Sequence, residues 1–115
     1  MSERLRPPER IRRRVDYLRI QKKGARTHGR FLTLIALPNG TEKARLGVSA
    51  SRRLGGAVLR NRAKRLIREL FRRNKPAAGF DLVVIPKPEL LEAPLAALEE
   101  DFRSALQRHA RTFRS

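Results

Sequence analysis

The sequence predicts a single small α+β domain in which helices pack on a four-stranded sheet. Its 115 residues match the length of one small domain. Hydrophobic residues make up 40% of the chain, which is enough for a modest core. Apolar residues recur in the order helix, strands, helix, strand, helix. This layout is typical of an α+β sandwich with helices against one sheet.

In the N-terminal part of the chain, the sequence predicts a flexible basic arm followed by a first helix. Residues 1–8 form the arm, which ends at two consecutive prolines. Residues 9–115 then form the single folded domain. Its first helix is expected over residues 9–23, because Gly24 ends the run.

Two faces of this first helix differ in composition. Ile11, Val15 and Leu18 follow one another at i, i+4 and i+7, which predicts an apolar stripe facing the core. Tyr17 and Gln21 fall away from that stripe, on a face shared with arginines. We therefore expect the Tyr17 ring to be available for a role outside the core.

Strand patterns occupy the middle of the chain. We expect a loop over residues 24–30, which can include a short edge strand. A buried strand is expected over residues 31–37. The Pro-Asn-Gly sequence at residues 38–40 is a strong turn signal. Strict alternation predicts a further strand over residues 44–50, and an apolar run predicts another over residues 80–85, closed by a proline.

The alternating strand has one apolar and one small, polar face. The apolar face carries Ala44, Leu46, Val48 and Ala50, and the other face carries Arg45, Gly47 and Ser49. Because that second face is small and holds a cation, it suits a groove for an extended ligand better than a packed layer.

Two further helices have clear apolar sides. The first is expected over residues 57–73, after a Gly-Gly break, and the second begins near Pro94, a residue suited to a first helical position. The predicted core residues of these helices are Leu59, Ala63, Leu66, Ile67 and Leu70 in the first, and Leu95, Leu98, Phe102, Leu106 and Phe113 in the second.

Charge is the strongest functional signal in the composition. Twenty-eight Lys and Arg residues against eleven Asp and Glu residues give a formal net charge of +17. Self-repulsion of this size weakens a compact state, so we expect a polyanionic partner. Phosphate backbones attract such proteins by releasing condensed counterions, and guanidinium groups pair well with phosphate. The domain at residues 9–115 is therefore expected to bind RNA.

Catalytic and membrane functions find little support in the sequence. The chain has no cysteine, no long apolar segment and no nucleotide-binding glycine motif, so we expect a cytoplasmic protein without a thiolate site or membrane contact. His28 and His109 lie far apart, without the neighbours of a catalytic centre. The acidic run at residues 99–101 predicts a solvated helix surface, with Glu99 paired to Arg103. We expect no catalytic residue and no metal ligand in the protein.

The helix at residues 57–73 concentrates like charges on one face. Lys64 and Arg68, and Arg68 and Arg72, are spaced at i and i+4, and Arg65 lies beside them. Such pairs destabilise an isolated helix by a few tenths of a kcal/mol each. A helix that concentrates repulsion in this way is most simply a docking surface for a polyanion.

The residues from Ser51 to Arg72, SRRLGGAVLRNRAKRLIRELFR, resemble the signature of the bacterial ribonuclease P protein component. Two basic residues are followed by Gly-x-Ala-Val-x-Arg-Asn-x-x-Lys-Arg-x-x-Arg, matched from Arg52 to Arg68. The resemblance also covers Asp16-Tyr17, Arg45-Leu46-Gly47 and the strand at residues 81–85. It implies a protein subunit that assists a catalytic RNA in removing the 5′ leader of precursor tRNA and broadens its substrate choice.

The same resemblance implies roles for particular residues. One protein is expected per RNA, and Mg²⁺ is expected to be held by the RNA subunit, with no cofactor on the protein. The residues implied to bind the RNA subunit are Arg52, Arg53, Arg60, Asn61, Arg62, Lys64, Arg65, Arg68 and Arg72. The residues implied to bind the leader are Tyr17, Gln21, Arg45 and Ser49.

Two features qualify the resemblance. Family members often carry a second aromatic residue one turn after Tyr17, where this chain has Gln21, so a stacking contact is replaced by a polar side chain. General rules predict a right-handed connection between the strands at residues 44–50 and 80–85. The resemblance implies the rare left-handed connection found in certain ribosomal proteins, and we expect that form.

Three alternatives remain at the level of sequence. A ribosomal or other structural RNA-binding protein of the same fold would share the charge and the basic helix. An autonomous protein nuclease would cleave RNA without an RNA subunit. A membrane-surface helix is disfavoured, because the helix at residues 57–73 lacks bulky aromatics apart from Phe71.

Overall fold

The computed structural model describes residues 9–74 and 79–114, with side chains as far as His109. The predicted arm at residues 1–8 lies outside the described residues. The helices and strands are α1 (Arg14–Lys23), β1 (Ala25–His28), β2 (Leu32–Pro38), β3 (Arg45–Val48), α2 (Ala57–Arg73), β4 (Phe80–Pro86) and α3 (Leu95–Arg114). Short 3-10 helices at Arg52–Leu54 and Pro88–Glu92 precede α2 and α3.

The four strands form one mixed sheet in the order β1-β2-β4-β3. β2 pairs antiparallel with both β1 and β4, whereas β3 and β4 run parallel. A parallel pair needs a crossover connection, and α2 provides it. The predicted α+β class with helices on a four-stranded sheet is confirmed, including the short edge strand β1. The left-handed sense of the crossover stays a prediction.

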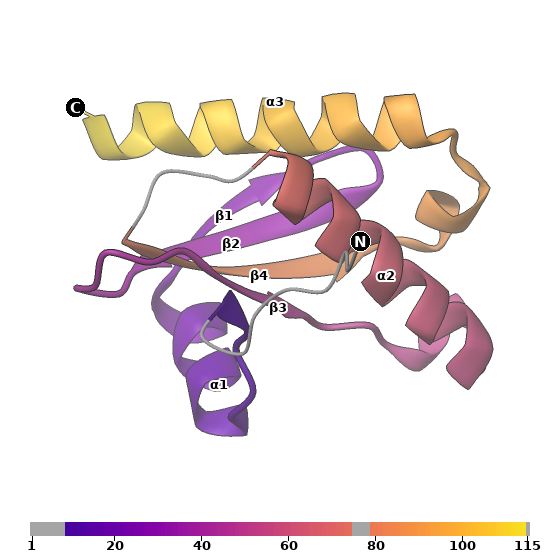
Figure 1. Cartoon of the computed structure of the whole chain (residues 1–115), viewed down its shortest axis with the longest axis horizontal. Helices are drawn as coiled ribbons and strands as arrows, with labels where there is room; N and C mark the ends of the chain where they lie inside the picture. Colours follow the sequence, from indigo (N-terminus) through magenta and orange to yellow (C-terminus); the bar gives the residue numbers. More distant parts are fainter. Residues whose placement is uncertain (1–8, 75–78, 115) are drawn as a thin grey trace.

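The helices cover the two faces of this sheet unequally (Figure 1). α2 and α3 lie on one face, and α1 lies on the opposite face. The α2 and α3 face holds the large apolar core, in which Phe71, Phe102 and Leu70 are completely buried. The core under α1 is much smaller and consists of Ile11, Ile20, Ile35 and Val83.

α2 forms as predicted, from Ala57 to Arg73. Gly55 precedes it with a φ of +123°, in the region that favours glycine, and a Cβ there would lie 2.5 Å from Leu59 Cδ1. Ala63, Ile67 and Leu70 are buried as predicted, Leu66 is partly buried and Leu59 is exposed. Phe71, which the predicted stripe omits, is also completely buried.

The predicted start of the first helix is wrong, because residues before Arg14 pair with the sheet. Arg10 forms a parallel bridge with Leu46 of β3, and the Ile11 N–H donates to the Leu46 carbonyl at 2.9 Å. Ile11 is therefore buried from an extended segment and not from a helix.

The predicted stripe of Ile11, Val15 and Leu18 is wrong for the same reason. Ile11 lies outside α1, so the spacing does not define one helix face. Val15 and Leu18 are 59% and 52% exposed, and α1 instead turns Ile20 and Tyr17 towards the sheet. Tyr17 is thus on the sheet side of its helix, and not opposite the core as predicted.

α3 begins at Leu95, directly after Pro94, and buries Leu98, Phe102 and Ala105. Leu106 is partly buried, Leu95 is 37% exposed, and the side chain of Phe113 lies outside the described part of the chain.

The acidic run of α3 has structural contacts, which corrects the prediction of a merely solvated surface. Asp101 accepts hydrogen bonds from the backbone N–H groups of Arg30 and Phe31, both at 2.8 Å. The Asn74 side chain donates to Glu99 at 2.9 Å and accepts from Arg103 at 2.7 Å. Asn74 therefore bridges the predicted Glu99–Arg103 pair and connects the end of α2 to α3.

Candidate nucleic-acid interface

Basic side chains cover one side of α2. Arg62 and Arg65 are exposed beside Asn61, and Lys64 is partly buried. In the described part of the chain, neither Arg62 nor Arg65 forms an ion pair. Like charges at this spacing repel one another, so an anionic partner would stabilise this face.

The ends of α2 differ in charge. Arg52 and Arg53 are exposed in the 3-10 helix that precedes α2, and they extend its basic surface beyond its N-terminus. Near the C-terminus, Glu69 accepts hydrogen bonds from Arg72 at 2.9 Å and Arg73 at 2.8 Å. The N-terminal half of α2, which also contains partly buried Arg60, has no acidic residue and is the more basic half.

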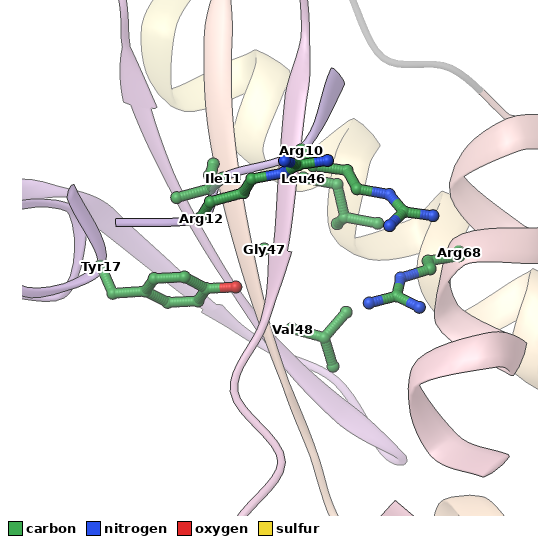
Figure 2. A pocket seen from close by; sticks show the side chains of 8 residues that line it. All are labelled: Arg10, Ile11, Arg12, Tyr17, Leu46, Gly47, Val48 and Arg68. Carbon is green, nitrogen blue, oxygen red and sulfur yellow. The ribbon is translucent and has the colours of Figure 1, made fainter. Parts of the chain in front are cut away.

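A cleft opens between α1, β3 and α2 (Figure 2). Its volume is about 160 Å³, and it is lined by Arg10, Ile11, Arg12, Tyr17, Leu46, Gly47, Val48 and Arg68. Tyr17 enters from α1, β3 forms the floor, and Arg68 approaches from α2 on the opposite side. The extended segment before α1 supplies Arg10 and Arg12.

Tyr17 lies close against β3 because Gly47 leaves room for it. A Cβ on Gly47 would be 2.7 Å from the Cε1, Cζ and Oη atoms of Tyr17, closer than such atoms approach. Partial burial raises the pKa of the Tyr17 phenol, and a hydrogen bond with the Val48 backbone and the charge of Arg68 oppose this increase. The phenol is therefore neutral and held in place at physiological pH.

Three arginines, Arg10, Arg12 and Arg68, line the cleft together with Tyr17. Burial lowers the pKa of Arg68, and the neighbouring positive charge of Arg10 lowers it further. The guanidinium groups of Arg10 and Arg68 therefore repel each other, and an anion bound in the cleft would relieve this repulsion. Arg10 was expected on the same helix face as Tyr17, but neither it nor Arg12 was among the predicted leader-binding residues. The dense positive charge before α1 is the signal that could have indicated both.

The predicted leader-binding residues do not all meet in this cleft. Tyr17 lines it, whereas Gln21 and Ser49 are partly buried and do not. Arg45 faces the α1 side of the sheet as predicted, but its guanidinium binds the Asp81 carboxylate at 2.8 and 2.6 Å. This hydrogen bond raises the pKa of Arg45 further. Arg68, predicted with the α2 surface, lines the cleft instead.

Acid–base and metal-binding groups are dispersed. His28 lies within hydrogen-bonding distance of Thr33 Oγ1, at 3.3 Å, and burial lowers the pKa of His109. Among residues 9–74 and 79–109, no three His, Asp or Glu side chains gather as a metal site requires. In the same part of the chain, no helix is long and apolar enough to cross a bilayer.

Comparison with known proteins identifies the family. The family model for ribonuclease P matches residues 5–110. The ribonuclease P protein component of Thermotoga maritima is 42% identical over 94 residues, which cover 80% of each chain. That of Syntrophus aciditrophicus is 44% identical over 85 residues, or 72% of this chain and 71% of the relative.

Solved structures show the same similarity. The T. maritima ribonuclease P protein superposes with a TM-score of 0.79 at 38% identity, covering 87% of this chain and 96% of the other. The Staphylococcus aureus protein gives a TM-score of 0.76 at 32% identity, covering 86% and 93%. These matches favour a subunit of the tRNA-processing ribonucleoprotein over the ribosomal alternative. Sequence, fold and basic surface therefore agree that the chain belongs to the ribonuclease P protein family.

Proposed function

We propose that the protein binds a catalytic RNA subunit through α2 and holds the 5′ leader of precursor tRNA in the cleft beside Tyr17. Its family makes it a component of ribonuclease P with an RNA partner. We further propose that the RNA subunit is the catalyst and carries the Mg²⁺ ions. One protein binds each RNA, and the complex acts in the cytoplasm.

The observation that carries this proposal is the presence of two basic surfaces, the exposed side of α2 and the cleft beside Tyr17. The exposed cations Arg62 and Arg65 on α2 suit a folded RNA, because they present charge outward without neutralising partners nearby. The cleft combines a tyrosine with arginines, which suits an extended single strand held by stacking and phosphate contacts.

The cleft also revises the set of leader-binding residues. Arg10 and Arg68 point into it, and they replace Arg45 as the proposed phosphate contacts because Arg45 is committed to Asp81. Arg12 lies at the same opening and extends the basic track towards the N-terminal segment. Gln21 and Ser49 remain proposed contacts only for nucleotides beyond the cleft.

Reconstitution tests the proposed role in cleavage. The protein is added to a bacterial ribonuclease P RNA at a Mg²⁺ concentration too low for the RNA alone, and removal of the leader is measured. We expect the protein to restore cleavage and to show none without the RNA. Metal-dependent cleavage of precursor tRNA by rigorously RNA-free protein would contradict the assignment of catalysis to the RNA.

An RNA-free control on messenger RNA belongs to this experiment. One solved S. aureus ribonuclease P protein, with a TM-score of 0.78 at 31% identity, is described as a mutant with defective mRNA degradation activity. We expect no such activity from this chain alone, because its described acids and histidines are dispersed.

Replacing Tyr17 tests the cleft. In the assembled enzyme, Tyr17→Ala should weaken binding of leader-bearing precursor by about 1–3 kcal/mol, the usual contribution of one stacked base. Mature tRNA lacks the leader and should bind almost as before. Equal losses for both ligands would mean that the leader lies elsewhere.

A further inference from the structure

Asp81 is a completely buried carboxylate at the start of β4, on the face of the sheet that α1 covers. It pairs across the sheet with Leu37 of β2 and with Arg45 of β3. A buried charge is costly unless other groups compensate it, so the groups that bind the Asp81 carboxylate indicate its structural role.

Three elements meet at this carboxylate. From β3, Arg45 donates two hydrogen bonds, one to each oxygen, at 2.8 and 2.6 Å. From the turn after β2, the Asn39 side chain donates one at 2.9 Å. From α1, Arg19 reaches the carboxylate at 3.4 Å. Burial alone would raise the pKa of Asp81, but the hydrogen bonds from Arg45 and Asn39 and the charges of Arg45 and Arg19 together lower it, so the group is ionised.

The contact from Arg19 matters because little else holds α1. Ile20 is the one side chain of α1 that is completely buried, and the apolar core to which it belongs contains only three other buried residues. Tyr17, two residues before Arg19, rests on Gly47 with no space to spare. The height of α1 above β3 therefore sets where the Tyr17 ring lies in the cleft.

We infer that Asp81 is a positioning residue for the cleft: its carboxylate fixes α1 over β3 through Arg19 and withdraws Arg45 from RNA binding. This inference rests on the proposed function only for its effect on leader binding. Its effect on Tyr17 can be measured in the protein alone.

The chain supplies its own reporter for that measurement. Tyr17 is the single tyrosine, and there is no tryptophan, so tyrosine fluorescence and phenol absorbance report on the cleft alone. In the wild type we expect slow quenching by acrylamide and a phenol pKa above the ordinary 10.0.

The first test compares Asp81→Asn with Asp101→Asn. Asp101 is the control, because it is also a carboxylate held by hydrogen bonds, in its case two from backbone N–H groups of a loop on the α3 side. Both variants should lose stability. Only Asp81→Asn should speed the quenching of Tyr17, return its pKa towards the ordinary value and lower the preference for precursor over mature tRNA several-fold. The same changes in both variants, or in neither, would overturn the inference.

A milder pair keeps the test decisive if Asp81→Asn fails to fold. Arg19→Gln removes the contact from a side chain that is 44% exposed, and Lys22→Gln removes an exposed cation from the same helix. We expect faster quenching and a reduced precursor preference in Arg19→Gln alone. Unchanged quenching in Arg19→Gln would overturn the role of Asp81.

Tyr17→Ala separates the two proposals. If it leaves the precursor preference intact, the leader assignment fails, while the fluorescence results still decide whether Asp81 positions α1. If Tyr17→Ala abolishes the preference but Arg19→Gln changes neither quenching nor preference, the inference about Asp81 fails and the leader assignment stands.

Discussion

On the face of the sheet that carries α2 and α3, sixteen of the described side chains form one buried apolar core, whereas four do so on the α1 face, Ile20 of α1 included. Burying one large apolar side chain stabilises a protein by about 1.5–3 kcal/mol, so the first face supplies most of the stability. The second face carries the ionised Asp81, the Tyr17 cleft and its arginines. Because one face holds the fold together, the other can keep the charges and the open space that recognition requires.

A core substitution gives the largest expected effect and tests the stable face. Phe102 is completely buried on α3, and Phe102→Ala should lower the free energy of unfolding by about 3–5 kcal/mol, through lost burial and an unfilled cavity. Denaturant unfolding measures this loss. The fraction that remains folded should keep its preference for precursor over mature tRNA. A selective loss of that preference would break the proposed division between the faces.

Gly47→Ala tests the other face. The new Cβ would lie 2.7 Å from Tyr17, so the ring must move away from β3. We expect a loss of stability of about 1–3 kcal/mol, as for other overpacked sites, together with a weaker precursor preference. Tyrosine fluorescence shows the displacement directly. If the Tyr17 ring stays in place and leader binding is unchanged, the close contact between Tyr17 and Gly47 is wrong.

Removing exposed cations from α2 sharpens the distinction between docking and leader binding. The double variant Arg62→Ala and Arg65→Ala should weaken binding to the RNA subunit, with the salt dependence flattened by about one unit of slope per lost phosphate contact. Unfolding should change little, because both side chains are exposed. Arg108→Ala on α3 is the matched control, and an equal effect there would show attraction by net charge alone.

Acid should give the smallest effect of these four predictions. It should lower the stability contributed by the two faces of the sheet in different pH ranges. Burial lowers the pKa of His109, so folding disfavours its protonation, and stability falls as the pH drops below about 6.5. Asp81 has a lowered pKa, so its contribution is complete above the ordinary value of 3.8 and is lost as the pH falls through the folded value. Unfolding of His109→Phe and wild type across this range should differ only in the upper step.

Local signals in the sequence were sufficient for the stable face. The bounds of α2 followed from the Gly55-Gly56 break and from apolar residues at helical spacing. The apolar run of β4 and the alternation of β3 were equally clear, and Leu46 and Val48 face the core as predicted. In these elements the periodic pattern and the tertiary contacts agree, except that Leu59 of α2 is exposed and Phe71, outside the predicted stripe, is buried.

The α1 face depended on contacts between distant residues, which a periodic pattern does not contain. Ile11 and Val15 have helical spacing, but the bridge between Arg10 and Leu46 draws Ile11 out of the helix. The Asp81 site combines a helix, a turn and two strands. One signal was present: an acidic residue within an apolar strand requires a buried cation, and Arg45 faces the same side of the sheet.

The bridge between Arg10 and Leu46 also bears on solubility. β3 is an edge strand, and unpaired backbone groups at an edge are a template for pairing with another chain. The Ile11 N–H satisfies the Leu46 carbonyl, and the neighbouring arginines place positive charge along the same edge. The short segment that supplies two arginines to the cleft therefore also hinders the sheets of two molecules from joining through β3.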